Sequence, residues 1–143
     1  MGGDMLIIGI DPGSNTGVAV YDEGRLVRLM TVEPMHIGAI LAGHSPERVI
    51  FEDSRLQTHT WTQAKTRAAA LKMARNVGEV DAWCRLIVAE CEKLGIPAHG
   101  ISPKRKGAKL DAAQFEAATG WTGSSNEHTR DAAMVAFPYR RGT

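Results

Sequence analysis

Two carboxylates in this sequence stand at the ends of short apolar runs, where a protein can hold a side chain rigidly for chemistry. Asp11 follows the run Leu6–Ile10 and precedes a Pro-Gly pair, and Glu52 follows the run Val49–Phe51. Short runs that are rich in β-branched residues and bounded by Gly or Pro are typical of buried strands. A carboxylate at the end of such a strand is a rigid platform for a metal ion or a phosphate, whereas the simpler alternative is that it caps the following turn.

A third carboxylate, Asp131, lies three residues after His128 in a segment of helical composition. Residues three apart project from one helix face, and a helix that crosses the strand ends would bring this face to Asp11 and Glu52. Oxygen-rich clusters suit Mg²⁺ or Mn²⁺ better than Zn²⁺, which prefers Cys and His, and many nucleases hold a phosphodiester with two such ions about 4 Å apart. The three carboxylates therefore predict a two-metal site, although a surface acid at Glu52 and a helix-dipole role for Asp131 are the ordinary alternatives.

Basic residues are concentrated in two segments without acids. The formal net charge of the chain is only +1, yet residues 54–78 and 94–110 contain Lys and Arg and no Asp or Glu. Charge runs are commonly solvated faces, but two of them in a nearly neutral protein predict one positive face for a polyanion. Bound metal ions would offset the negative charge of the three carboxylates, which would otherwise repel the phosphates of a polyanion on this face. The predicted polyanion-binding residues are Arg55, Lys65, Arg67, Lys72, Arg75, Lys104, Arg105, Lys106 and Lys109.

The predicted elements must position these side chains, and their order is that of an α/β protein. We expect one domain over residues 1–143, with residues 1–4 disordered or vector-derived. The order β-β-β-α-β-α-β-α-α predicts a mixed five-stranded sheet flanked by helices. The predicted strands are Met5–Asp11, Thr16–Tyr21, Arg25–Val32, Arg48–Glu52 and Pro97–Ile101, and the predicted helices are Met35–Ala42, a long one from about Thr62 to Leu94, Lys109–Thr119 and Asn126–Phe137, the last opened by a capping box at Ser124 and Glu127.

Three sequence blocks together resemble the RuvC-type Holliday-junction resolvases of the RNase H-like superfamily. The blocks are Ile8–Gly17, Phe51–Glu52 and His128–Ala136, which occur in the family's order over nearly the whole chain. The resemblance implies an RNase H-like fold and a Mg²⁺- or Mn²⁺-dependent endonuclease that cuts four-way and related branched DNA junctions by paired phosphodiester hydrolysis, with two ions in each active site. The catalytic and metal-handling positions of the family carry over to Asp11, Glu52, His128 and Asp131, called here the four predicted site residues.

The chain also departs from the family pattern. Many members have Asp where this chain has His128, so the resemblance leaves open whether His128 binds metal or handles the attacking water. The aromatic residues that follow the second acid in the family are replaced by Asp53–Leu56. Lys104 and Lys109 are the nearest matches to the family's basic residues beside the DNA. The compact size of the chain is similar to that of phage-encoded members.

A symmetric homodimer is expected, because a four-way junction has two-fold symmetry and needs two paired nicks. The long helix carries one apolar stripe from Met73 to Leu94, including Val77 and Val80, which we expect to pack on the sheet. Its second face is made mostly of small side chains that allow close approach of another helix, although the helix before Gly120 is an alternative cover within the same subunit. This second face consists of Leu71, Gly78, Ala82, Leu86 and Ala89.

Rival functions differ from the resolvase in testable features. RNA-processing nucleases of the YqgF type have a similar first strand but usually a Lys-Arg pair in place of Asn15-Thr16. Phosphate-binding ATPases of the actin and sugar-kinase superfamily need a second Asp-x-Gly and a much longer chain. A protein that binds DNA junctions without cutting them would not need three carboxylates together, so metal-dependent nicking distinguishes it.

Further sequence features bear on the cellular location of the protein and on the roles of its Cys and Trp residues. No apolar run approaches the ~20 residues of a membrane span, and the N-terminus lacks a signal-peptide core, so we expect a cytoplasmic protein without a membrane partner, located in the host cytoplasm if it is phage-encoded. Cys84 and Cys91 are expected to be buried thiols. Trp61 and Trp121 are expected to pack rather than to stack on unpaired bases.

Overall fold

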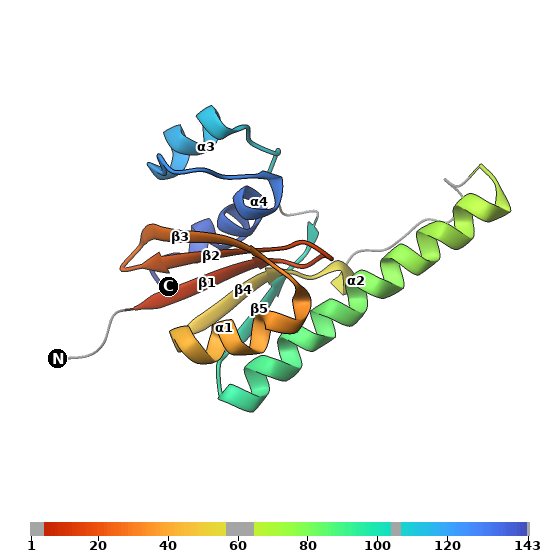
Figure 1. Ribbon diagram of the computed structural model, residues 1–143, viewed down its shortest axis with the longest axis horizontal. Helices are drawn as coiled ribbons and strands as arrows, with labels where there is room; N and C mark the ends of the chain where they lie inside the picture. Colours follow the sequence, from red (N-terminus) through yellow and green to blue (C-terminus); the bar gives the residue numbers. More distant parts are fainter. Residues whose placement is uncertain (1–4, 57–64, 104–106, 143) are drawn as a thin grey trace.

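The computed structural model describes residues 5–56, 65–103 and 107–142 (Figure 1). Within these ranges the chain forms one five-stranded mixed sheet with helices on both faces, in the predicted order of elements. Trp61 and the predicted basic residues Lys104, Arg105 and Lys106 lie outside the described residues. The strands and α-helices are β1 (Leu6–Asp11), β2 (Thr16–Asp22), β3 (Arg25–Val32), α1 (Ile37–His44), β4 (Arg48–Glu52), α2 (Arg67–Leu94), β5 (Ala98–Ile101), α3 (Ala112–Thr119) and α4 (Glu127–Ala136).

The sheet has the strand order β3-β2-β1-β4-β5. β1, β2 and β3 are antiparallel neighbours, whereas β4 runs parallel to β1 and β5 runs parallel to β4. The register pairs Ile10 with Phe51, so the carboxylates that follow these residues end adjacent parallel strands at the same edge of the sheet. The expected adjacency of the first and fourth strands is therefore confirmed.

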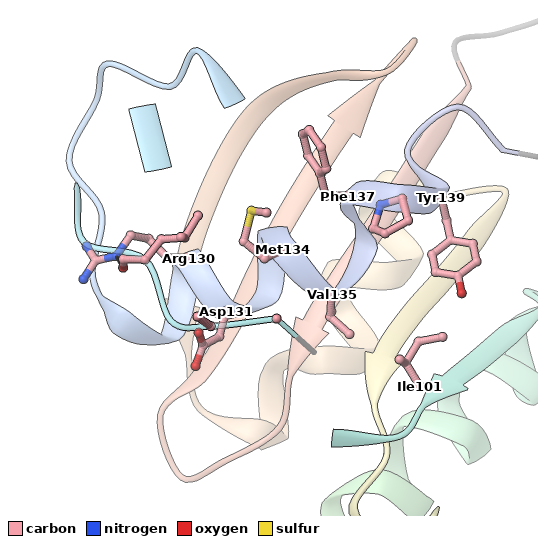
Figure 2. A pocket seen from close by; sticks show the side chains of 11 residues that line it. Ile101, Arg130, Asp131, Met134, Val135, Phe137 and Tyr139 are labelled. Atoms are coloured by element: carbon pink, nitrogen blue, oxygen red, sulfur yellow. Dashed lines mark hydrogen bonds between the residues drawn. The ribbon is translucent and has the colours of Figure 1, made fainter. Parts of the chain in front are cut away.

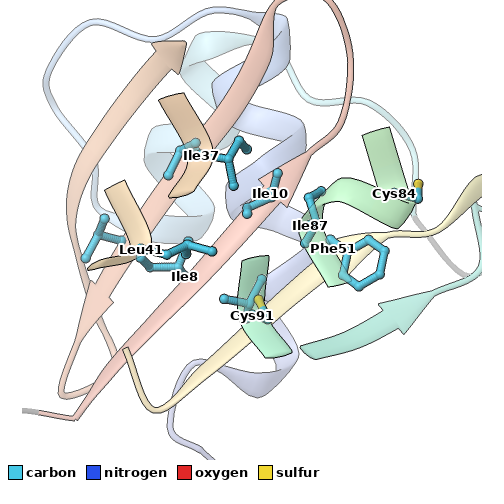
Figure 3. Packing of buried hydrophobic residues seen from close by; sticks show 11 residues of the cluster. Ile8, Ile10, Ile37, Leu41, Phe51, Cys84, Ile87 and Cys91 are labelled. Carbon is cyan, nitrogen blue, oxygen red and sulfur yellow. The ribbon is translucent and has the colours of Figure 1, made fainter. Parts of the chain in front are cut away.

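Side chains that alternate along the strands build one hydrophobic core on each face of the sheet. Ile8 and Ile10 of β1 pack with α1 and α2 on one face (Figure 3). Ile7 of β1 and Tyr21 of β2 pack with α3 and α4 on the other face. The helices thus divide into two layers, with α1 and α2 on one side of the sheet and α3 and α4 on the other (Figure 1).

α2 packs on the sheet only from Val80 onward, so the expectation that its whole apolar stripe does so is wrong. Cys84, Ile87 and Cys91 are buried, whereas Leu94 is 39% exposed and the N-terminal half of the helix extends beyond the sheet (Figure 1). The reason is length: at 1.5 Å per residue, 28 residues span about 42 Å, whereas the five residues of β4 span about 17 Å. Within the described residues, no helix combines the length and apolarity of a membrane span.

Two helix ends differ from the prediction for local reasons. α1 continues past Gly43 to His44, and Ser45 rather than Gly43 adopts the left-handed conformation that ends the helix. α3 begins at Ala112 rather than at Lys109, because the side chain of Asp111 accepts a hydrogen bond from the main chain of the first turn and caps it. Lys109 therefore lies in the loop before α3, where its side chain is free to turn toward α4.

Candidate active site

The turn between β1 and β2 fixes the loop that follows Asp11. The hydroxyl of Thr16 is buried and donates a hydrogen bond of 2.7 Å to the carbonyl oxygen of Gly13. Asp11 stands where β1 enters this turn, and its side chain is 16% exposed. A strand end that is held in this way presents the carboxylate to solvent without letting it swing freely.

Two glycines allow α4 to lie directly against the sheet. A Cβ atom at Gly9 of β1 would overlap the main-chain carbonyl of Ala132, and one at Gly17 of β2 would overlap that of His128. The Tyr21 hydroxyl of β2 anchors the same helix, since it donates a buried hydrogen bond of 2.7 Å to the carbonyl oxygen of Ala133. The close contact places the first turns of α4 beside the end of β1.

The start of α4 is capped by a different box from the predicted one. Asn126 is the N-cap, and its side chain and that of Thr129 exchange hydrogen bonds with each other's main-chain NH groups. The predicted cap at Ser124 is wrong, because the Ser124 carbonyl accepts the indole NH of Trp121 and the chain enters the helix two residues later. Asn126 also donates a hydrogen bond of 2.9 Å to Thr31 of β3, which fixes the helix start over the sheet.

One pocket of about 450 Å³ is lined by all four predicted site residues, from β1, β4 and α4. The Nδ1 atom of His128 lies 3.8 Å from Oδ2 of Asp11, and the His128 side chain is 44% exposed. Asp131 is almost buried, and its side chain is 11% exposed. The structure therefore brings together residues that lie far apart in the sequence, while their catalytic roles stay a prediction.

Lys109 places a positive charge inside this pocket. Its ammonium group forms an ion pair with Glu127 and lies 3.7 Å from Oδ2 of Asp131. The hydrogen bond between Lys109 and Glu127 raises the pKa of the lysine and holds the pKa of the glutamate below its usual value. One residue predicted to bind DNA thus lies among the predicted catalytic residues.

The donor atoms of the pocket suit a hard divalent cation. They are carboxylate oxygens with one imidazole, the set that binds Mg²⁺ or Mn²⁺ rather than Zn²⁺. Among the described residues, no three His, Cys, Asp or Glu side chains stand close enough together to hold a metal ion as they are placed. The ammonium of Lys109 beside Asp131 shows that a cation is accommodated at this edge of the pocket. Ligation of a metal by these residues stays a prediction.

The other predicted basic residues divide into two groups. Arg55 forms a two-bond ion pair with Asp53, with both distances 2.9 Å, so its guanidinium group is engaged within the protein. Burial opposes ionisation of Asp53, but the hydrogen bonds and the charge of Arg55 outweigh it and hold the pKa of Asp53 below its usual value. The remaining group is exposed at and just before the N-terminal half of α2, and it consists of Lys65, Arg67, Lys72 and Arg75.

Besides β1, β4 and α4, one face of α2 lines the pocket, and the sequence alone does not predict this face to be part of the site. Asn76, Glu79, Val80 and Trp83 line it, at the spacing of one helix face. This spacing is visible in the sequence, and Val80 packs against the core of the sheet as predicted while it also lines the pocket. Which strand ends lie opposite this face depends on how α2 crosses the sheet, and that information is tertiary.

A second pocket lies on the other side of Asp131 (Figure 2). It has a volume of about 510 Å³ and is lined mainly by apolar side chains of α4, the segment after it, and β5, including Met134, Phe137 and Ile101. Of the four predicted site residues, only Asp131 reaches it. The smaller pocket, which contains all four residues, is therefore the candidate active site.

Comparison with known proteins yields structural neighbours only. No family model matches the chain, and a comparison with curated proteins likewise finds no match. "T. thermophilus RuvC in complex with Holliday junction substrate" superposes with a TM-score of 0.65 and 20% sequence identity, over 96% of this chain and 96% of that chain. "Thermus thermophilus RuvC structure" gives a TM-score of 0.62 and 18% identity, over 94% of this chain and 93% of that one. The chain therefore has a RuvC-like fold of the RNase H-like class, as its sequence blocks implied.

Proposed function

We propose that the protein is a divalent-metal-dependent endonuclease that resolves four-way and related branched DNA junctions. The observation that carries the proposal is the single pocket lined by Asp11, Glu52, His128 and Asp131, contributed by three separate elements. The fold supports it, because solved RuvC structures superpose on nearly the whole chain and one of them was determined with a Holliday junction substrate.

In this proposal the three carboxylates of the four predicted site residues hold Mg²⁺ or Mn²⁺, as two ions in each site. The ions would supply Lewis-acid stabilisation of the phosphodiester and a more acidic water. His128 is partly exposed beside Asp11, and in the proposal it would orient or deprotonate the attacking water. Lys109, which pairs with Glu127 and Asp131, is placed to neutralise the phosphate charge that approaches the same pocket.

DNA arms would extend along the exposed basic residues at the N-terminal half of α2. These residues lie on the part of the helix that extends beyond the sheet, so they are accessible to a large ligand (Figure 1). Neutralisation of several phosphates by Lys and Arg makes such binding strongly salt-dependent. Arg55 contributes less than predicted, because its guanidinium group is paired with Asp53.

Two copies of the chain would supply the paired nicks. The second apolar face of α2 is largely exposed, with Leu71 at 54%. The alternative cover within the subunit is wrong, because α3 buries Phe115 in the core on the opposite side of the sheet (Figure 1). We therefore retain this face of α2 as the homodimer interface in the proposal.

The test is a cleavage assay on a synthetic four-way junction, a fork and a linear duplex, with Mg²⁺ and with EDTA. We expect metal-dependent paired nicks in the junction and little cutting of the duplex. Asp131→Asn should abolish cutting and leave junction binding intact or tighter, since it removes a negative charge from the pocket. Glu116→Gln is the matched control, because it removes one charge from an exposed site on α3 outside the pocket.

Each rival predicts a different result. Tight binding of the junction without cutting in Mg²⁺ or Mn²⁺ would identify a non-catalytic junction-binding protein and overturn the proposal. Cutting of structured RNA in preference to the DNA junction would instead favour the YqgF-type nuclease. Wild-type cleavage rates in the Asp131→Asn variant would remove Asp131 from the catalytic machinery.

A further inference from the structure

The face of α2 that lines the candidate active site carries a polar and an aromatic side chain without a hydrogen-bond or ring partner in the described part of the protein. Asn76 and Trp83 line the pocket opposite the strand ends. Within the described residues, neither side chain has a hydrogen bond or ring contact to the rest of the protein. Polar and aromatic groups that face a pocket without protein partners are available to a ligand.

Trp83 differs from an ordinary packed tryptophan. It follows the pocket side of α2, while its neighbour Cys84 points into the core that α2 forms with the sheet. Partly buried apolar side chains such as Val80 and Val88 pack against that core, but Trp83 does not belong to either core of the described structure. Trp121, by contrast, packs against the other core and donates its indole NH to Ser124.

The pocket has room for one nucleotide between the residues of α2 and those of α4 that line it. Its volume of about 450 Å³ lies within the range of about 300–1,000 Å³ that small-ligand sites occupy. A phosphate held by Lys109 and by metal ions bound at the carboxylates would direct the attached sugar and base toward the opposite wall. An indole provides a stacking surface for any base, and an Asn amide can form paired hydrogen bonds to a base edge.

We propose that Trp83 stacks on the nucleotide beside the scissile phosphate, that Asn76 contacts its base edge, and that together they set the position of the cut. This inference rests on the proposed nuclease function and extends it to the recognition of the cut strand. The two residues are substrate-contacting groups, and they lie two helical turns apart on one face of α2.

The first experiment maps cut positions on four-way junctions that differ only in the nucleotides at the crossover. Loss of one base–aromatic contact weakens binding by about tenfold, so Trp83→Ala should slow cutting by about that factor at every position, because stacking accepts any base. Trp83→Phe, which keeps an aromatic ring, should retain most of the cutting rate, and Asn76→Ala should alter the order of preferred bases. Trp121→Phe is the matched control and should cut like the wild type.

The second experiment uses binding alone, so that it does not depend on catalysis. The chain has three tryptophans, and Trp61→Phe with Trp121→Phe leaves Trp83 as the sole indole emitter. Addition of a four-way junction with Ca²⁺, whose charge would offset the carboxylates of the pocket, should quench its fluorescence, because a stacked base quenches indole. The quenching should saturate at the same DNA concentration as the shift of the junction in a gel.

The outcomes separate this inference from the proposed function. A wild-type cutting rate in Trp83→Ala, together with an unchanged order of preferred bases in Asn76→Ala, overturns the inference and leaves the nuclease proposal standing. Junction binding without quenching of Trp83 overturns it as well. If the wild-type protein binds the junction with quenching but does not cut it, the nuclease proposal fails while the contact of Trp83 with DNA is supported. A protein that binds no junction refutes both.

Discussion

Replacing Gly17 by Ala tests whether the position of α4 on the sheet controls the candidate active site. A Cβ at this position would overlap the main-chain carbonyl of His128, which cannot move aside by a change of rotamer. The φ angle of Gly17 is not positive, so backbone strain adds nothing to the effect. The first turn of α4 would therefore have to lift from β2 and carry His128 and Asp131 away from Asp11.

The expected loss of stability is modest and the expected loss of activity is large. Inserting a methyl group into a close contact typically costs about 1–3 kcal/mol, which lowers the Tm of a domain of this size by roughly 3–10 °C. The hydrogen bond from Tyr21 to Ala133, one turn further along, still holds the rest of the helix on the sheet. A displacement of about 1 Å at a reacting centre, however, can cost about 10²-fold in rate.

Thermal unfolding followed by circular dichroism gives the Tm, and single-turnover cleavage of a four-way junction gives the rate. Gly43→Ala in α1 is the matched control, because no atom lies within 4 Å of its added Cβ. It should leave the rate unchanged and stabilise the protein by up to ~1 kcal/mol. Wild-type Tm and rate in Gly17→Ala would refute the close-contact argument, and a lowered Tm with a wild-type rate would show that the contact does not align the site.

Three further predictions address separate parts of the molecule. His128→Ala should slow cleavage by about 10²-fold or more if the imidazole handles the attacking water, and a loss of less than tenfold in single-turnover rates would exclude that role. Cys84 and Cys91 should react with a thiol reagent at pH 8 only after unfolding in urea, because both are buried and burial raises the pKa of Cys91 to about 11; rapid labelling of the native protein would contradict this. Ala82→Arg should yield a folded monomer that no longer makes paired nicks, and an unchanged dimer mass by light scattering would place the interface elsewhere.

The positions of Asp11 and Glu52 at neighbouring strand ends could be predicted from the sequence. They depend only on local hydrophobic patterns and on the parallel adjacency of β1 and β4. The apolar runs define the strands, and each carboxylate directly follows its run. Once β1 and β4 are parallel neighbours, their ends meet at one edge of the sheet. His128 and Asp131 could be added for a similar reason, since residues three apart share a helix face.

The α2 wall could not be predicted, because it depends on contacts between distant residues. The hydrogen bond from Ser54 to Asp81, 2.6 Å long, ties α2 to the short helix after β4. Burial of Cys84 and Ile87 then sets the rotation of α2 about its axis and turns Trp83 toward the strand ends. The periodicity in the sequence identifies faces of a helix, but it does not say which face meets which partner.

If the proposed function is right, the distribution of charge separates DNA binding from catalysis on the surface of the protein. The pocket contains more carboxylates than basic groups, and among its lining residues Lys109 is already paired with Glu127. A phosphate can enter such a pocket only if further cations offset the carboxylates. The exposed basic residues of α2, in contrast, lie outside the pocket and need no metal to attract DNA. Junction binding in EDTA together with cleavage only in Mg²⁺ or Mn²⁺ is therefore the pattern that this arrangement of charges requires.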